Sequence, residues 1–245
     1  IGNPDLKITN IDNYDFRLES YYQSGDNLSL SLFYKNFTDH IELVNTGLYT
    51  WENAKQGKIY GFELEGKKSF LRDFEVSGNF TYVYSLTNVE LQRLGVIETV
   101  EIERPMFGQA PYIINGLLSY NNENLGLLMG LSYNVQGPKL AITTISADEP
   151  DIYELPFHAL DFKLSKSVTE KIILELKVRN ILNAAITRAY DGDGISSPSW
   201  SKDPESERVR NLLKTTFSEN KHYTFEIPFD SYSYGPSVSL SFGFS

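Results

Sequence analysis

The feature that most constrains the fold is an alternation of apolar and polar residues that recurs along almost the whole chain. In the last nine residues, SVSLSFGFS, every second residue from Val238 to Phe244 is apolar, and the residues between them are serine or glycine. The same spacing recurs in NLSLSLFYKNF, FEVSGNFTYVYS and LGLLMGLSYNVQG. Successive side chains of a strand point to opposite faces, so this spacing predicts strands with one apolar and one polar face, whereas a helix would repeat every 3.6 residues.

The pattern predicts nine strands joined by connections of two alternating lengths. We place the strands at residues 15–23, 27–38, 58–70, 74–86, 112–121, 125–137, 157–167, 172–182 and 236–244. Four connections have the length and composition of tight turns: SGDN, LRD, NNEN and SVTEK. The other four are long, at residues 38–57, 87–111, 138–156 and about 184–235. An up-and-down sheet with one rim of short turns and one of long loops is typical of an outer-membrane barrel. The predicted fold class is therefore all-β, an antiparallel transmembrane β-barrel.

A soluble β-sandwich is the main structural alternative, because its strands alternate in the same way. Sandwich strands average about 5–6 residues, whereas several of the predicted strands reach ten or more, and their polar faces carry ionised groups that suit a hydrated lumen, such as Glu63, Glu175 and Lys177. Tyrosines gather near strand ends, as an interfacial aromatic girdle requires: Tyr21, Tyr22, Tyr34, Tyr82, Tyr84, Tyr120 and Tyr133. Bacterial single-chain barrels have even strand numbers, so about nine strands predict the end of a larger barrel.

Composition removes several function classes. Cysteine is absent, which excludes disulfides and thiolate metal sites. The formal net charge of −10 argues against a nucleic-acid partner. No apolar run is long enough for a transmembrane helix, and IGNPDLKITN lacks the features of a signal peptide. We expect a mature or internal piece of a protein that has no cofactor.

Catalytic and metal-binding signals are weak. The three histidines, at 40, 158 and 222, fall in different segments, and Asp39 beside His40 would point to the opposite face of a strand. The sequence therefore predicts no enzyme. Asp191 and Asp193 in YDGDGISS begin like a calcium loop, but the other ligand positions are missing, so a glycine turn is the favoured interpretation.

The last long connection contains a helical pattern at 203–217, with Asp203 as N-cap and Pro204 at the first position. Two interpretations stay open: a short helix packed over the barrel mouth, or a contact for a ligand or partner. In the second case the aromatic members of the ligand-binding loops are predicted to be Trp51, Tyr190, Trp200 and Tyr223.

The motifs also carry a family resemblance. In this order, GNPDLK, NIDNYDFRLESYY, YGFELEGKKSF, VSGNFTYVYS, GQAPYIINGLLSY, LSYNVQG and LKVRNILN resemble the C-terminal part of the barrel of a TonB-dependent outer-membrane receptor, over essentially all of residues 1–245. The resemblance implies a 22-stranded barrel closed by an N-terminal plug, of which these strands are the last nine. It also implies energy-dependent uptake of a scarce nutrient such as a siderophore, glycan, peptide or vitamin. The family commonly ends on an aromatic residue, whereas Ser245 follows Phe244 here; Val238, Leu240, Phe242 and Phe244 are the expected assembly signal.

The expected partners are outer-membrane lipids, the plug and the remaining strands, and the TonB complex acting through the plug. The expected location is the bacterial outer membrane, with a periplasmic C-terminus. Two other functions stay open: a passive porin or surface adhesion barrel, and a structural subunit in a complex with a surface lipoprotein.

Overall fold

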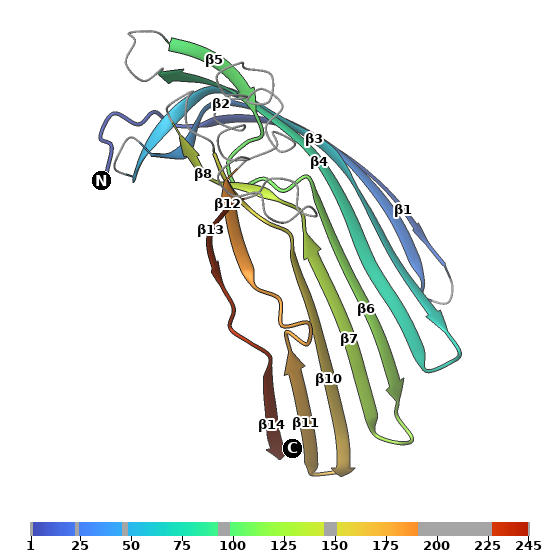
Figure 1. Ribbon diagram of the computed structural model, residues 1–245. Coiled ribbons are helices and arrows are strands. Elements are labelled where there is room, and N and C mark those ends of the chain that lie inside the picture. Colours follow the sequence, from blue (N-terminus) through green and yellow to red (C-terminus); the bar gives the residue numbers. More distant parts are fainter. Residues whose placement is uncertain are drawn as a thin grey trace, which may run out of the picture.

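Nine long strands form one curved antiparallel wall. The computed structural model describes residues 2–22, 25–45, 49–92, 99–144, 151–190 and 227–244, and every regular element in these ranges is a strand. Within them, no helix is long and apolar enough to cross a membrane. The wall follows the order β1-β2-β3-β4-β6-β7-β10-β11-β14 (Figure 1). Its strands are β1 Asn10–Tyr21, β2 Asn27–Asn45, β3 Tyr49–Phe70, β4 Phe74–Gln92, β6 Tyr112–Asn122, β7 Leu127–Gln136, β10 Phe157–Thr169, β11 Ile172–Arg179 and β14 Ser237–Phe244.

These strands confirm the nine predicted from the alternation and the all-β class. The largest difference in their bounds is at the long-loop ends of β2, β3 and β4, which extend beyond the predicted limits. The connection 38–57, predicted to be a long loop, is in fact a continuation of the β2–β3 hairpin, in register as far as Asn45 and Tyr49. The prediction was wrong because the face that this extension buries carries His40 and Glu42, polar residues that do not give an apolar alternation.

The short turns are joined to one another along one rim of the wall. The backbone N–H of Ser69 donates to Asp26 in the β1–β2 turn at 2.8 Å. The N–H of Asn121 donates to the Asp73 carbonyl of the β3–β4 turn, and that of Ser167 to the Gly126 carbonyl, both at 2.8 Å. Each of these three tight turns thus bonds to the next hairpin, so the rim is continuous from β1 to β10.

Aromatic side chains mark both ends of the outward apolar face. Tyr14, Tyr34, Tyr60 and Tyr84 are consecutive register partners across β1 to β4. At the short-turn end, Phe70, Phe74 and Tyr120 form a second group with ring centroids 5.7 and 4.9 Å apart. Along β3, Tyr60 and Phe70 are separated by about 33 Å at ~3.3 Å per residue, which a tilt of about 40° converts to ~25 Å, the height of an apolar band in a membrane barrel.

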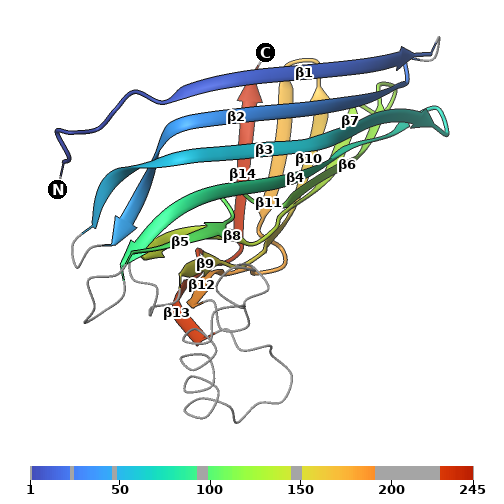
Figure 2. The same ribbon diagram turned by 90° about the horizontal axis from the view of Figure 1, so that it is seen from above.

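Five shorter strands lie in the long connections and were not predicted. They are β5 Thr99–Arg104, β8 Lys139–Thr144, β9 Ile152–Glu154, β12 Ile186–Tyr190 and β13 Ile227–Tyr232. β5 pairs with β4, and β8 pairs in parallel with the tip of β2, Val44 opposite Thr143. β9 and β12 extend this sheet to β13, so the four strands gather at one end of the wall (Figure 2).

We call this group the rim assembly: the β2 and β3 tips beyond Thr38, the end of β4 from Thr87, β5, residues 105–111, and β8, β9, β12 and β13. It contains the tightest packing in the described part of the chain. The largest fully buried side chains are all in it: Arg104, Leu140, Thr87 and Thr143.

Candidate functional site

The polar face of the wall is a hydrogen-bonded surface. Arg17 on β1 donates to the hydroxyls of Ser31 and Ser29 on β2 at 2.9 and 3.0 Å, and forms an ion pair with Glu65 on β3. Alternation places all of these side chains on the face opposite the apolar band. Three neighbouring strands therefore present one connected polar strip.

A second strip crosses β3, β4, β6 and β7. The side-chain amide of Asn79 donates to Glu63 at 2.9 Å, and that of Asn115 donates to the side-chain oxygen Oδ1 of Asn79 at 2.6 Å. Asn134 donates in turn to Asn115. Each side-chain amide both donates and accepts, so the strip offers both kinds of hydrogen-bonding group to whatever fills the lumen.

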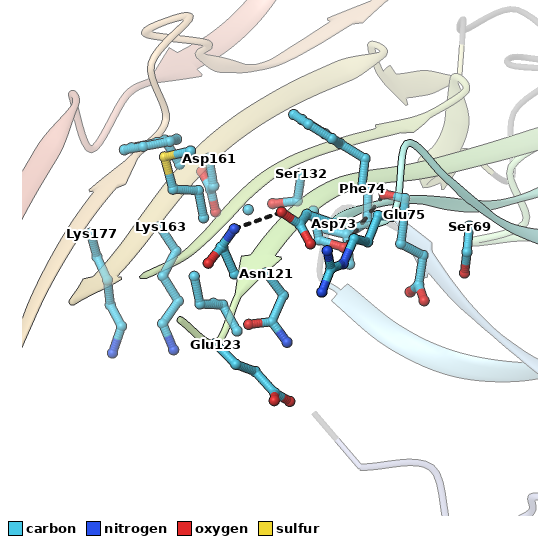
Figure 3. A pocket seen from close by; sticks show the side chains of 18 of the residues that line it. Ser69, Asp73, Phe74, Glu75, Asn121, Glu123, Ser132, Asp161, Lys163 and Lys177 are labelled. Atoms are coloured by element: carbon cyan, nitrogen blue, oxygen red, sulfur yellow. Dashed lines mark hydrogen bonds between the residues drawn. The ribbon is translucent and has the colours of Figure 1, made fainter. Parts of the chain in front are cut away.

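A hollow of about 890 Å³ lies on the same face toward the short-turn rim. Lys163 and Lys177 stand side by side at one end of it, with Asp73 and Glu75 toward the other (Figure 3). Glu175 lies between the two lysines, 2.6 and 2.8 Å from their ammonium nitrogens. Because positive and negative side chains are both present and partly exposed, the hollow is suited to contact with water or with another polar surface.

A different kind of site lies in the rim assembly, around the Glu42 carboxylate. Glu42 Oε2 accepts from Arg104 at 3.0 Å, and Oε1 lies 3.2 Å from His40 Nε2 and 3.3 Å from the Phe107 nitrogen. Since a carboxylate only accepts, His40 Nε2 carries the hydrogen. The other side of Arg104 faces Asp151, with nitrogen-to-oxygen distances of 3.3 and 3.4 Å. These four side chains, which we call the rim cluster, are all buried.

Glu42 and Arg104 of the rim cluster each stabilise the charged form of the other. Glu42 lies on β2 beyond the outward apolar band, eight residues past Tyr34 of the tyrosine group. Burial opposes its ionisation, but the hydrogen bond from His40 and the positive charge of Arg104 outweigh burial and lower the pKa of Glu42. Burial likewise opposes the charge on Arg104, and Asp151 and Glu42 outweigh it and raise the pKa of Arg104. Glu42 and Arg104 are therefore held in their ionised forms.

Two of the four predicted ligand-binding aromatics lie in the described ranges. Trp51 is 42% exposed on the β3 tip, where its carbonyl accepts from the Asn3 side chain at 2.9 Å. Tyr190 ends β12 in another part of the rim assembly, edge-to-face with Phe229 at 5.7 Å between centroids. Trp200 and Tyr223 lie outside the described residues. The ligand-binding role of all four stays a prediction.

The remaining sequence predictions fall partly inside and partly outside the residues that the structure describes. The weak metal candidates Asp191 and Asp193 and the helical pattern at 203–217 lie outside the described residues. Among residues that the structure describes, no group of three or more His, Asp or Glu side chains is arranged to hold a metal ion. Val238, Leu240 and Phe242 project from β14 with 63 to 70% exposure, and Phe244 is in register with Ile172. Their role as an assembly signal stays a prediction.

The rim cluster was missed by sequence reasoning. One signal was available, since His40 and Glu42 are two residues apart and must share a face if the strand continues. Nothing local connects them to Arg104 or Asp151, which are 62 and 109 positions from Glu42. Their proximity depends on how the long connections fold back.

A family model described as TonB dependent receptor-like, beta-barrel matches residues 1–181. The chain belongs to the TonB-dependent receptor β-barrel family. This confirms the resemblance read from the ordered motifs and identifies the curved wall as part of such a barrel. No curated protein matches the chain.

Solved structures agree on the fold. The copper transporter OprC is 14% identical, with a TM-score of 0.58 over 99% of this chain and 32% of its own. The ferric-catecholate import receptor Fiu from E. coli is 13% identical, with a TM-score of 0.52 over 76% of this chain and 25% of its own. The siderophore receptor PirA from Acinetobacter baumannii is 18% identical, with a TM-score of 0.51 over 74% of this chain and 29% of its own. The chain thus spans about a quarter to a third of the structures that it resembles.

Proposed function

We propose that this chain forms the C-terminal wall of a receptor that takes up a scarce nutrient across the bacterial outer membrane with energy supplied by the TonB complex. Family membership over residues 1–181 carries the proposal. The wall supports it, because an outward apolar band and an inward polar face are what a membrane-spanning barrel around a hydrated, plugged lumen requires. A transport role needs no catalytic group.

The polar strips and the hollow are proposed to contact a plug domain contributed by another part of the full-length protein. Glu63, Asn79 and Asn115 offer donors and acceptors to such a domain, and Lys163 and Lys177 offer charge. The long-connection rim would face the outside and the short-turn rim the periplasm. Because Phe244 pairs with Ile172 at the short-turn rim, the C-terminus would be periplasmic.

Uptake by cells with and without the full-length receptor tests the function. A ferric catecholate chelate and copper ions are reasonable first substrates, since structurally similar proteins are described as a ferric-catecholate import receptor and a copper transporter. Further arms would supply a glycan, a peptide or a vitamin as the limiting nutrient. We expect receptor-dependent uptake of one of these nutrients to stop when a protonophore collapses the proton gradient.

Receptor-dependent uptake that continues with the gradient collapsed would instead indicate a passive porin. If the receptor supports no uptake and co-purifies with a stable lipoprotein, the structural-subunit alternative is correct. The substrate screen therefore separates all three functions considered for the sequence.

A further inference from the structure

Residues 105–111, which we call the lumen strap, fold back onto the inward face of the wall. Met106 packs in a buried cluster with Ile59 of β3 and Val83 of β4. Ile59 lies four residues from Glu63 on the same strand, so it shares the polar, inward face. The partly buried Phe33 of β2 joins the cluster from that face. The strap therefore occupies space on the lumen side, at the level along the strands where Tyr60 and Tyr84 project from the opposite face.

The strap backbone is bonded to three parts of the molecule. The N–H of Met106 donates to Ser85 Oγ of β4 at 3.2 Å. The N–H of Phe107 donates to Glu42 Oε1 of β2 at 3.3 Å, and that of Gly108 to the Leu140 carbonyl of β8 at 2.8 Å. At its end, the Pro111 carbonyl accepts from the N–H of Val83 at 2.9 Å. These bonds hold the strap at both ends and in the middle.

Arg104 directly precedes the strap and connects it to the rest of the rim assembly. Its side chain is 1% exposed, and it pairs with Glu42 of β2 and with Asp151 next to β9. Removing one member of a buried ion network leaves the other charges uncompensated. Loss of Arg104 should therefore release the strap.

The packing around the strap is that of a fixed element. Segments that open easily have few buried apolar contacts and exposed backbone hydrogen bonds. Here Met106, Ala110 and Leu140 are 7%, 1% and 0% exposed. Both the apolar burial and the ion network oppose displacement.

We propose that the lumen strap is a permanent constriction, fastened by Arg104, that narrows the lumen in front of β3 and β4 whether or not a substrate is bound. A substrate would then pass beside the strap instead of displacing it, which limits the size of what the lumen admits. This use of the strap depends on the proposed transport function, but its position and immobility can be tested without transport.

Cysteine labelling in the purified full-length receptor tests the constriction, with any cysteine outside this chain replaced. Ser85 lies under the strap, and the chain has no cysteine of its own. We expect the Ser85→Cys thiol to react with a maleimide at least ~10-fold more slowly than the thiol of Glu52→Cys, an exposed position on the β3 tip. Adding Arg104→Met should bring the two rates close together.

Arg188→Met is the matched control for the loss of Arg104. Arg188 is also in the rim assembly, but it pairs with Asp230 of β13 instead of with a partner of the strap, and this ion pair is partly exposed. This substitution should leave the Ser85→Cys thiol slow to react. If the Ser85→Cys thiol is as reactive as the Glu52→Cys thiol without Arg104→Met, there is no permanent constriction. Slow labelling that Arg104→Met does not change would overturn the fastening role of Arg104.

Hydrogen exchange of the otherwise unmodified receptor provides a second measurement, should Arg104→Met fail to fold. Peptides covering 105–111 should exchange as slowly as wall peptides from β6 and β7. Exchange of 105–111 within seconds would contradict the proposal. Neither readout involves uptake, so a failed transport assay would leave the strap result standing, and the reverse also holds.

Discussion

The wall and the rim assembly are built on different physical principles, although the same strands pass through both. In the wall, both faces are partly exposed, and Leu32, Leu64 and Leu118 remain 42 to 46% exposed. The strands are held by backbone ladders, and in the proposed barrel the outward side chains would be buried by lipid. In the rim assembly, Leu140 and Thr143 are completely buried within the chain. One region therefore leaves its outward apolar side chains exposed within the chain, whereas the other buries side chains in a core of its own.

The ion pairs show the same difference. Arg17 and Glu65 on the wall have side chains that are 43% and 36% exposed, so solvent or the lumen contents can replace either partner. Arg104 and Glu42 are 1% and 3% exposed, and no such replacement is available. An ion pair of the wall should tolerate substitution, whereas the rim cluster should not.

The largest effect is expected for Glu42→Ala. This substitution leaves Arg104 and His40 without their shared acceptor, and breaking a buried ion pair costs about 3–5 kcal/mol. Hydrogen exchange should show loss of protection in the rim assembly with β6 and β7 unchanged. Glu52→Ala is the control, because Glu52 is the register partner of Glu42 on β3 but is exposed. Loss of protection across the entire wall would show that the two regions are not separable.

A charge on the outward face should have the next largest effect. Leu64 lies between Tyr60 and Phe70 on β3, and an arginine near the bilayer centre costs about 2–4 kcal/mol. Leu64→Arg should lower the stability of the full-length receptor in lipid bilayers by this amount, measured by urea titration. Thr81→Arg, on the inward face in register with Glu63, should change it far less. Equal losses for both variants would mean that the outward face is not the lipid face.

Lowering the pH should destabilise the rim assembly gradually, in contrast to the two substitutions. The pKa of Glu42 is lowered on folding from its ordinary value of 4.5, so its stabilising charge is fully present above that value and is lost as the pH falls through the folded pKa. The charged and titratable groups that contact it in the described part of the chain are His40 and Arg104. Arg104 in turn contacts Asp151 and lies close to Tyr153.

Hydrogen exchange of residues 105–111, corrected for its intrinsic pH dependence, measures this effect. Protection should decrease as the pH falls below 4.5. Glu42→Gln removes the titrating group and should flatten the decrease that Glu42 contributes. Protection that rises toward acid would contradict the role of the Glu42 carboxylate.

The wall could be predicted from the sequence because its strands and turns are specified by residues that are close together in the chain. Two-residue alternation specifies which side chains share a face, and short turns such as Leu71–Arg72 connect strands that are neighbours in the chain. The exposed apolar set on β14, from Val238 to Phe242, follows from the same rule. The rim assembly could not be predicted in this way, because its strands are short and its buried face includes polar residues.

The sequence by itself determined the class of fold, the nine wall strands and their two faces, since each depends on residues that are close together in the chain. Only the tertiary structure decided that β8 returns to the tip of β2, where Thr143 donates to the Leu43 carbonyl 100 residues away. It also decided that Arg104 lies between Glu42 and Asp151. A buried charge is stable only when oppositely charged partners are buried with it. No local sequence pattern indicates which distant segments supply those partners.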